Sequence, residues 1–248
     1  MVDTDCSLAG KAAVITGAGR GIGRAIAMGY ARAGAAICCA ARTESEIQET
    51  VAQIRNEGGT ALAVQTDVTQ WIAVQELFDT ADSQLGGIDI AVINAGINSH
   101  QRIVEDSDPD AWEATLHTNL LGAYYCAKAA ISALRKRGGG KIITIGSGLG
   151  HSGRPGSSAY SCSKAALWML TRTLAQELWQ YNISVNELIP GPVETQMSRS
   201  RGDGESVFGR ESEWIKSPEE VVPMALFLAT QPEVGPTAQS FSLMRRDT

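Results

Sequence analysis

The sequence predicts an α/β fold, with a single domain over residues 1–248 built on a doubly wound parallel sheet of about seven strands with helices on both faces. Three observations lead to this prediction. Short apolar runs alternate with segments of helical periodicity along the chain, which is the pattern of repeated βα units. A glycine-rich turn joins the first apolar run to the first helical segment. No linker, repeat or low-complexity tract divides the 248 residues, a length that one α/β domain commonly reaches.

The individual elements follow from the same patterns. Helices fill the intervals between strands, and two of them have recognisable starts: Asp108-Pro109, and Ser217-Pro218 with Glu220 three residues after the cap. Parallel order places the carboxyl ends of the strands along one edge, where open α/β sheets bind ligands. The predicted strands are residues 12–16, 36–41, 61–66, 89–93, 140–146, 182–188 and 238–243.

The turn after the first strand reads Thr-Gly-Ala-Gly-Arg-Gly-Ile-Gly over residues 16–23. Glycines let the backbone take positive φ and let a ligand approach, and the amides at a helix start attract an anion such as a pyrophosphate. The spacing is not G-x-G-x-x-G, because the third position falls on Ile26, and no Lys-Ser or Lys-Thr follows to make a P-loop. Alone, the turn is equally compatible with a structural βα connection or the cofactor loop of a methyltransferase.

Tyr160 and Lys164 lie four residues apart in a predicted helix, so both project from one face about one turn apart. A free phenol titrates near pH 10, and a nearby ammonium lowers that pKa by favouring the phenolate. We therefore expect Tyr160 to exchange a proton with an alcohol or carbonyl oxygen. A Tyr-Lys pair at this spacing also arises by chance in long helices, so its significance depends on the neighbouring motifs.

Composition excludes several classes of function. The formal net charge of −6 argues against a general nucleic-acid binder, and no apolar run approaches the length of a membrane span. The first residues lack the features of a signal peptide, so we expect a cytoplasmic protein. The five cysteines are expected to be reduced, with Cys38 and Cys39 in the core and Cys162 near the site without a role. His100, His117 and His151 have no zinc-type spacing, so no metal is expected.

Several short motifs occur in register with the predicted strand ends. They are Thr-Gly-x-x-x-Gly-x-Gly from Thr16, Asn94-Ala95-Gly96, Asn119, Ser147 thirteen residues before Tyr160, Tyr-x-x-x-Lys, and Pro190-Gly191-Pro192-Val193-Glu194-Thr195. Together they resemble the short-chain dehydrogenase/reductase family over roughly residues 8 to 230, and Ile-Ile-Thr-Ile-Gly-Ser at 142–147 is similar to the 3-oxoacyl-[acyl-carrier-protein] reductase-like branch. The resemblance implies a Rossmann fold of strand order 3-2-1-4-5-6-7 and hydride transfer between a nicotinamide cofactor and a ketone, 3-oxoacyl substrate or secondary alcohol.

The resemblance also implies catalytic roles. Tyr160 is the general acid in reduction and the base in oxidation, and Lys164 lowers its pKa and bonds the nicotinamide ribose. Ser147 donates to the substrate oxygen, although a serine at a strand end can instead cap the turn. Asn119 holds a water for proton relay, although an asparagine there can simply satisfy a helix bend.

The cofactor residues implied by the resemblance lie at successive strand ends. Asp67, with Val68, is expected at the adenine edge, although an Asp before a helix is often only a cap. Thr195 is expected at the nicotinamide amide or the phosphates. The full set is Gly17, Arg20, Gly21, Ile22, Gly23, Arg42, Asp67, Val68, Asn94, Ala95, Gly96, Tyr160, Lys164, Pro190, Gly191, Val193 and Thr195.

The second strand ends in Ala41-Arg42, where NAD-preferring members place a carboxylate in the position of Ala41. Arg42 can pair with a 2′-phosphate through its planar guanidinium, with Arg20 on the other side, so we expect NADP(H) rather than NAD(H). The alternative is that Arg42 is a solvated residue at a strand end.

Substrate and assembly are less constrained by the sequence. The pattern-free stretch 195–216 corresponds to a substrate lid in the resembling family, whose members also suggest a homotetramer. The basic run Arg135–Arg137 is followed by glycines, and Gln176 and Tyr181 are neutral, so docking of an acyl carrier protein is not favoured. The carboxyl-terminal tail departs from the family pattern. The alternatives are an NAD-dependent polyol, sugar or secondary-alcohol dehydrogenase, and a catalytically silent dinucleotide-binding regulator.

Overall fold

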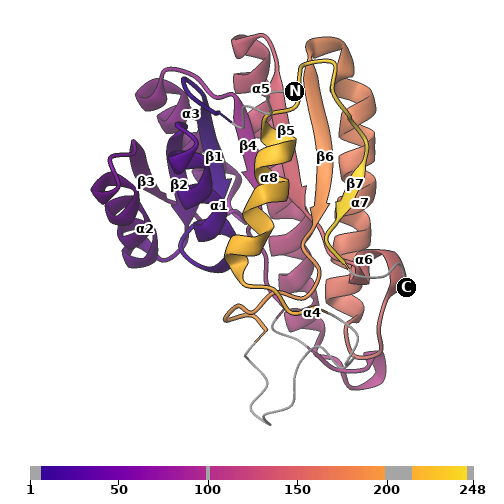
Figure 1. Ribbon diagram of the computed structural model, residues 1–248. Coiled ribbons are helices and arrows are strands. Elements are labelled where there is room, and N and C mark those ends of the chain that lie inside the picture. Colours follow the sequence, from indigo (N-terminus) through magenta and orange to yellow (C-terminus); the bar gives the residue numbers. More distant parts are fainter. Residues whose placement is uncertain (1–6, 99–100, 199–213, 245–248) are drawn as a thin grey trace.

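The computed structural model describes residues 7–98, 101–198 and 214–244. They form one domain around a sheet of seven parallel strands in the order β3-β2-β1-β4-β5-β6-β7, as the resemblance implied (Figure 1). The strands are β1 Ala12–Thr16, β2 Ala36–Ala41, β3 Ala61–Gln65, β4 Ile90–Ile93, β5 Gly140–Ile145, β6 Ile183–Ile189 and β7 Ser240–Ser242.

Helices cover both faces of the sheet, as the fold class predicts. The buried side chains of α1, α2 and α8 pack on one face, and those of α3, α5 and α7 on the other. In Figure 1, α8 crosses in front of the strands and α7 lies behind β6 and β7. The α-helices are α1 Gly21–Arg32, α2 Glu44–Asn56, α3 Trp71–Leu85, α4 Pro109–Leu116, α5 Gly122–Arg137, α6 Leu149–Ser152, α7 Ser158–Leu178 and α8 Val222–Ala229. The short turns are η1 Val104–Asp106, η2 His117–Leu121, η3 Trp179–Tyr181 and η4 Pro218–Val221.

The central strands are apolar throughout because both of their faces are covered. In β2, Cys38 packs on the α3 face and Cys39 on the α1 face, since successive side chains point to opposite sides of a strand. Burial raises the pKa of both thiols, that of Cys39 to about 12. These two cysteines are therefore unreactive core residues, as predicted, while Cys162 is exposed.

The structure differs from the predicted elements at a few positions. β7 is confined to Ser240–Ser242 instead of 238–243, because Ala238 has a positive φ of 60° that does not fit a regular strand. The capping box predicted at Ser217 and Glu220 is present and opens η4, which leads into α8. Helical periodicity did not predict η2, a π-helical turn between α4 and α5.

The strand order reverses between β1 and β4: the chain first builds outward from β1 to β3, and then crosses to β4 and builds toward β7. All strands are parallel, so their carboxyl ends meet at one edge, the lower edge of the sheet in Figure 1. A crevice at such a switch point is the place where open α/β sheets bind ligands. Within the described ranges, no helix combines the length and apolar character required to cross a bilayer.

Candidate active site

The glycine turn has the conformation that the sequence predicted. Gly17 and Gly21 have φ values of 67° and 54°, in the left-handed region that favours glycine. A Cβ on Gly23 would overlap the Gly17 carbonyl oxygen and the side-chain amide of Asn94. The turn therefore brings the start of α1 against the end of β4, and it leaves the first backbone amides of α1 without helical partners.

Thr16 and Asn94 fasten the ends of β1 and β4 together. The Thr16 hydroxyl oxygen accepts from the backbone N–H of Asn94 at 3.0 Å and of Ala95 at 3.1 Å. The Asn94 Nδ2 donates to the Thr16 carbonyl oxygen at 2.8 Å. The sequence motif included Thr16, but we had not assigned it to the site. Its role is to hold the crevice at the switch point in a fixed shape.

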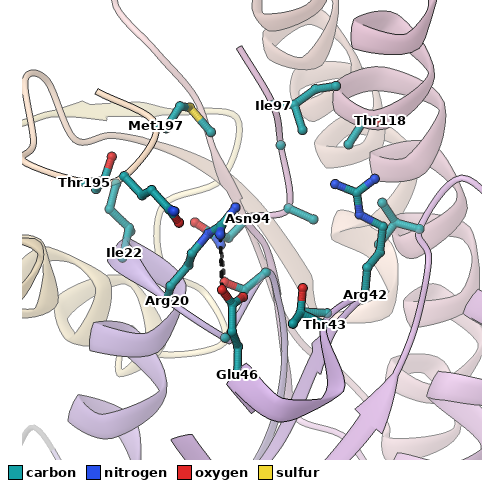
Figure 2. Close-up of a pocket in the computed structure, with 18 of the residues that line it drawn as sticks. Arg20, Ile22, Arg42, Thr43, Glu46, Asn94, Ile97, Thr118, Thr195 and Met197 are labelled. Atoms are coloured by element: carbon teal, nitrogen blue, oxygen red, sulfur yellow. Dashed lines mark hydrogen bonds and ion pairs between the residues drawn. The ribbon is translucent and has the colours of Figure 1, made fainter. Parts of the chain in front are cut away.

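A pocket opens over this turn, and Figure 2 shows Arg20, Arg42, Asn94 and Thr195 around it. It contains many of the residues that we expected to bind a cofactor: Gly17, Arg20, Gly21, Ile22, Arg42, Asp67, Val68, Asn94, Ala95, Gly96 and Thr195. Its wall also includes residues that the sequence did not single out as cofactor-binding: Gly19, Ala41, Thr43, Glu46, Thr66, Ile97, Thr118, Gln196 and Met197. Predicted residues outside the pocket wall are Gly23, Asn119, Ser147, Tyr160, Lys164, Pro190, Gly191 and Val193.

The two arginines of the pocket differ in their partners. Arg20 forms an ion pair with Glu46, with 3.1 Å between Nη1 and Oε1, and Figure 2 marks this contact. Arg42 follows the end of β2 and lies across the pocket from Arg20. Arg20 is thus engaged by a carboxylate that we had not considered. In the sequence, Glu46 stands three residues after Thr43, which is the spacing of a capping box. In the structure, Thr43 makes no side-chain capping bond, and Glu46 pairs with Arg20 instead.

Asp67 lines the pocket, but its carboxylate is held locally. Oδ1 accepts from the backbone N–H of Thr69 at 2.9 Å and from its hydroxyl at 2.8 Å. The cap of α3 is Gln70, so Asp67 forms a turn ahead of the helix and does not cap it. Opposite the glycine turn, the methyl group of Thr195 would lie 3.3 Å from a Cβ on Gly21.

The predicted catalytic residues converge beside this pocket. Tyr160 and Lys164 lie one turn apart on α7, with the Lys164 Nζ 5.8 Å from the centre of the Tyr160 ring. Lys164 donates to the carbonyl oxygen of Ile145, the last residue of β5, at 2.7 Å. The Ser147 hydroxyl lies next to the Tyr160 phenol and lowers its pKa, and it accepts from the backbone N–H of Leu149 at 3.2 Å. Ser147 thus supports its turn and contacts the phenol.

The electrostatics of this group differ from the expectation. Burial raises the pKa of Tyr160 above its ordinary value, and the hydrogen bond from Ser147 opposes that rise. The structure therefore does not give the acidified phenol that we expected from Lys164. The physical reason is that removal from water disfavours the phenolate more than a hydrogen bond stabilises it. Burial also lowers the pKa of Lys164 to about 8, while the nearby Glu187 raises it.

Asn119 connects the catalytic residues to the pocket. It lies in the π-helical turn and is buried. Its Nδ2 donates to the Ile97 carbonyl oxygen at 2.9 Å and to the Ser163 hydroxyl at 3.0 Å, and its Oδ1 accepts from the Ile97 N–H at 2.8 Å. Ser163 in turn donates to the Tyr160 carbonyl oxygen at 2.7 Å. Asn119 therefore holds both the pocket wall and the backbone of Tyr160, and it does more than satisfy a bend.

The remaining predicted positions lie after β6. Gly191 has a positive φ of 67°, so the turn at Pro190 and Gly191 requires a glycine there. Val193 is buried and pairs with Lys216 in an isolated bridge. Most of the stretch 195–216, the expected lid, lies outside the described residues, as do Arg199, Arg201 and His100. Within the described part of the chain, no cluster of His, Cys, Asp and Glu could hold a metal ion.

Comparison with known proteins shows consistent similarity. The family model described as short chain dehydrogenase matches residues 11–206. The chain is 34% identical to a 3-oxoacyl-[acyl-carrier-protein] reductase of Synechocystis, with 96% of each chain covered. It is 36% identical to an NADPH-dependent aldehyde reductase-like protein of Arabidopsis thaliana, over 90% of this chain and 88% of that protein. The crystal structure of a short-chain type dehydrogenase/reductase from Mycobacterium marinum superposes with a TM-score of 0.89 at 36% identity, covering 96% of this chain and 95% of that one.

Proposed function

Because the chain belongs to the short-chain dehydrogenase family, whose members are oxidoreductases, we propose that it reduces a ketone or 3-oxoacyl substrate with NADPH, and that Tyr160 is the general acid. The observation that supports this most directly is the Lys164 Nζ held 5.8 Å from the centre of the Tyr160 ring, with Ser147 next to the same phenol. Asn119 couples this group to Ile97 in the pocket wall. An acid, a second hydroxyl and a cation thus lie next to a pocket built on a glycine turn.

The pocket fits a dinucleotide. Its floor is the start of α1, where unpartnered backbone N–H groups and the helix dipole favour a pyrophosphate. Because Gly21 has no side chain, the space between it and Thr195 stays open. When bound, the nicotinamide supplies the hydride. Gly17, Gly21 and Ile22 would hold the phosphates, and Asp67 and Val68 would lie at the adenine.

The catalytic residues can then handle the proton and the charge. The raised pKa of Tyr160 keeps its hydroxyl protonated at neutral pH, which is the form needed to donate to an oxygen that gains negative charge. Ser147 donates a second hydrogen bond to that oxygen and stabilises the charge as it develops. The Lys164 ammonium stabilises the phenolate that remains after the proton has moved. In alcohol oxidation the same residues act in reverse, with Tyr160 as the base.

NADPH is the proposed cofactor because the end of β2 has Ala41 where a carboxylate would select NADH, and Arg42 follows it in the pocket wall. Its guanidinium can pair bidentately with a 2′-phosphate. We expect Arg42→Ala to weaken NADPH binding by about tenfold or more, the loss of one charge-assisted contact, and NADH binding much less. Fluorescence titrations with both nucleotides measure this. Equal losses would show that Arg42 does not contact the phosphate.

Glu46 is the one observation that favours an NAD-dependent polyol, sugar or secondary-alcohol dehydrogenase. It lines the same pocket as Arg42, and its carboxylate neutralises Arg20. A negative charge near the ribose repels a 2′-phosphate. The cofactor preference therefore depends on which charge lies closer to that phosphate, that of Arg42 or that of Glu46.

An initial-rate screen separates these possibilities. The purified chain is assayed with NADPH and NADH against ketones, 3-oxoacyl thioesters, diketones and sugars, and in reverse with polyols and NAD. We expect NADPH oxidation with a ketone or a 3-oxoacyl thioester. Turnover only of polyols or sugars with NAD would favour the alternative. NADPH binding without turnover of any substrate would indicate a catalytically silent dinucleotide-binding protein.

We also propose a homotetramer. Exposed apolar side chains on the outer surfaces of α5 and α7, Tyr124 and Met169, are 41% and 52% exposed and would be covered in an assembly. Light scattering after gel filtration tests this, and a monomer at micromolar concentration would contradict it. Docking of an acyl carrier protein through 135–137 is not proposed, because Lys136 pairs with Asp82 and Arg137 with Asp89.

A further inference from the structure

Glu187 is a buried carboxylate that the mechanism above does not use. It lies in the middle of β6, pairs in register with Thr144 of β5, and is 1% exposed. Its side chain points to the face of the sheet that α7 covers, because its register partner Thr144 contacts Thr171 of α7. An ionisable group buried inside a sheet is costly unless it is paired.

Two neighbours hold one oxygen of this carboxylate. Glu187 Oε2 accepts from the Ser240 hydroxyl of β7 at 2.5 Å and lies 3.0 Å from His151 Nε2 of α6. His151 packs against Trp168, one turn after Lys164 on α7, with 5.0 Å between ring centres. The carboxylate is therefore held by two elements, β7 and α6, and α6 in turn packs against α7, the helix that carries Tyr160 and Lys164.

The other oxygen lies against the end of β5. Glu187 Oε1 has no hydrogen-bond partner among the residues that the structure describes, and a Cβ on Gly146 would overlap it. Gly146 lies between Ile145, whose carbonyl accepts from Lys164, and Ser147, which is bonded to Tyr160. The free oxygen of a buried carboxylate thus lies at the strand segment that anchors both catalytic groups.

We propose that Glu187 is a positioning residue whose buried negative charge keeps the Lys164 ammonium charged and in place beside Tyr160. This inference rests on the proposed function only for the role of Lys164 in catalysis. A buried ammonium favours loss of its proton, and a carboxylate nearby opposes that loss. The pKa of Lys164 is lowered to about 8 by burial even with Glu187 raising it. Without Glu187, the pKa of Lys164 would be lower still.

The charged and titratable groups around the pair are few in the described part of the chain. Lys164 faces Tyr160 on its own helix and Glu187 on β6, and its hydrogen bond goes to the neutral Ile145 carbonyl. Glu187 faces His151 on α6, Lys164 on α7, and the hydroxyl of Ser240, which does not titrate. His151 is the other ionisable side chain in contact with Glu187 in the described part of the chain, so the test includes a His151 variant.

The test separates charge from shape. Glu187→Gln keeps the shape and removes the charge, whereas Glu187→Asp keeps the charge and shortens the side chain. The protein is labelled with carbon-13 lysine, and the titration of the Lys164 Cε signal, assigned with Lys164→Met, reports its protonation without need for activity. We expect the midpoint to fall by about one unit or more in Glu187→Gln and to change less in Glu187→Asp. Glu177→Gln removes an exposed carboxylate from α7 and serves as the matched control, with no change expected.

The catalytic consequence is measured on the same variants. The alkaline limb of kcat/KM for NADPH-dependent reduction should move to lower pH in Glu187→Gln by the same interval as the Lys164 titration. His151→Gln should retain that limb, and its loss there would assign the limb to His151 and overturn the proposal. An unchanged Lys164 midpoint in Glu187→Gln, or an equal shift in Glu187→Asp, would likewise overturn it.

A second measurement covers the case in which Glu187→Gln does not fold. In the wild-type protein labelled at glutamate, the Glu187 carboxyl signal should respond as Lys164 titrates, and a flat signal through that range contradicts the pairing. The two proposals also fail separately. If no carbonyl compound is reduced but Lys164 still responds to the charge of Glu187, the proposed function fails and this inference holds.

Discussion

Replacing Lys164 by methionine should remove a cost that the folded protein bears near neutral pH. Burial lowers the pKa of this lysine from 10.5 to about 8. Each pKa unit corresponds to about 1.4 kcal/mol, so keeping the ammonium charged in the folded state costs about 3 kcal/mol relative to the unfolded chain. This cost arises because Lys164 is buried among α7, β5 and β6. A methionine side chain has a similar shape but no charge, so it has no such cost.

The sign of the pH dependence follows from the same shift. Between pH 8 and 10.5 the unfolded chain keeps the lysine proton and the folded chain has lost it, so the wild type gains stability as pH rises. Below pH 8 both states are protonated and the cost is fully present. The wild-type protein should therefore gain up to about 3 kcal/mol over Lys164→Met as pH rises through this window.

Urea unfolding of both proteins at half-unit steps from pH 7 to 10 measures the effect, because other titrations cancel in the difference. Lys136→Met is the control: Asp82 raises the pKa of Lys136, so its small contribution is lost at high pH and has the opposite sign. A stability difference between wild type and Lys164→Met that stays constant from pH 7 to 10 would refute the reasoning.

Two further predictions concern the pocket. Gly23→Ala should destabilise the fold by about 1–3 kcal/mol and weaken NADPH binding, because its Cβ would overlap the Gly17 carbonyl and Asn94. Urea unfolding measures the stability, and fluorescence titration measures the binding. Wild-type values in both measurements would contradict this packing. Glu46→Gln should tighten NADPH binding severalfold more than NADH binding, because it removes a negative charge from the pocket and releases Arg20. An equal change for the two nucleotides would show that Glu46 does not act on the 2′-phosphate.

Much of the fold could be predicted because the signals are local. Central strands such as β1 and β4 are buried on both faces, so they appear in the sequence as apolar runs, and β1 and β2 begin and end where predicted. The glycine turn was recognisable because positive φ at Gly17 and Gly21 requires that residue type. The family motifs then gave the strand order, which local patterns alone do not determine.

The features that could not be predicted depend on contacts between distant segments. The π-helical turn at Asn119 is stabilised by bonds to Ile97, and the pair of Arg20 and Glu46 joins two loops. The pKa of Tyr160 depends on burial, which spacing along a helix does not report. Glu187 had a visible signal, a carboxylate within a predicted buried strand, but its partners His151 and Ser240 come from other elements.

The most direct test of the central claim is single-turnover reduction by Tyr160→Phe. The enzyme is loaded with NADPH, mixed with the best carbonyl substrate of the screen, and followed by the loss of NADPH fluorescence in a stopped-flow instrument. We expect the variant to bind NADPH as the wild type does, since only one hydroxyl is removed, while hydride transfer slows by about a hundredfold or more. Hydride transfer at the wild-type rate in Tyr160→Phe would contradict the assignment of Tyr160 as the acid.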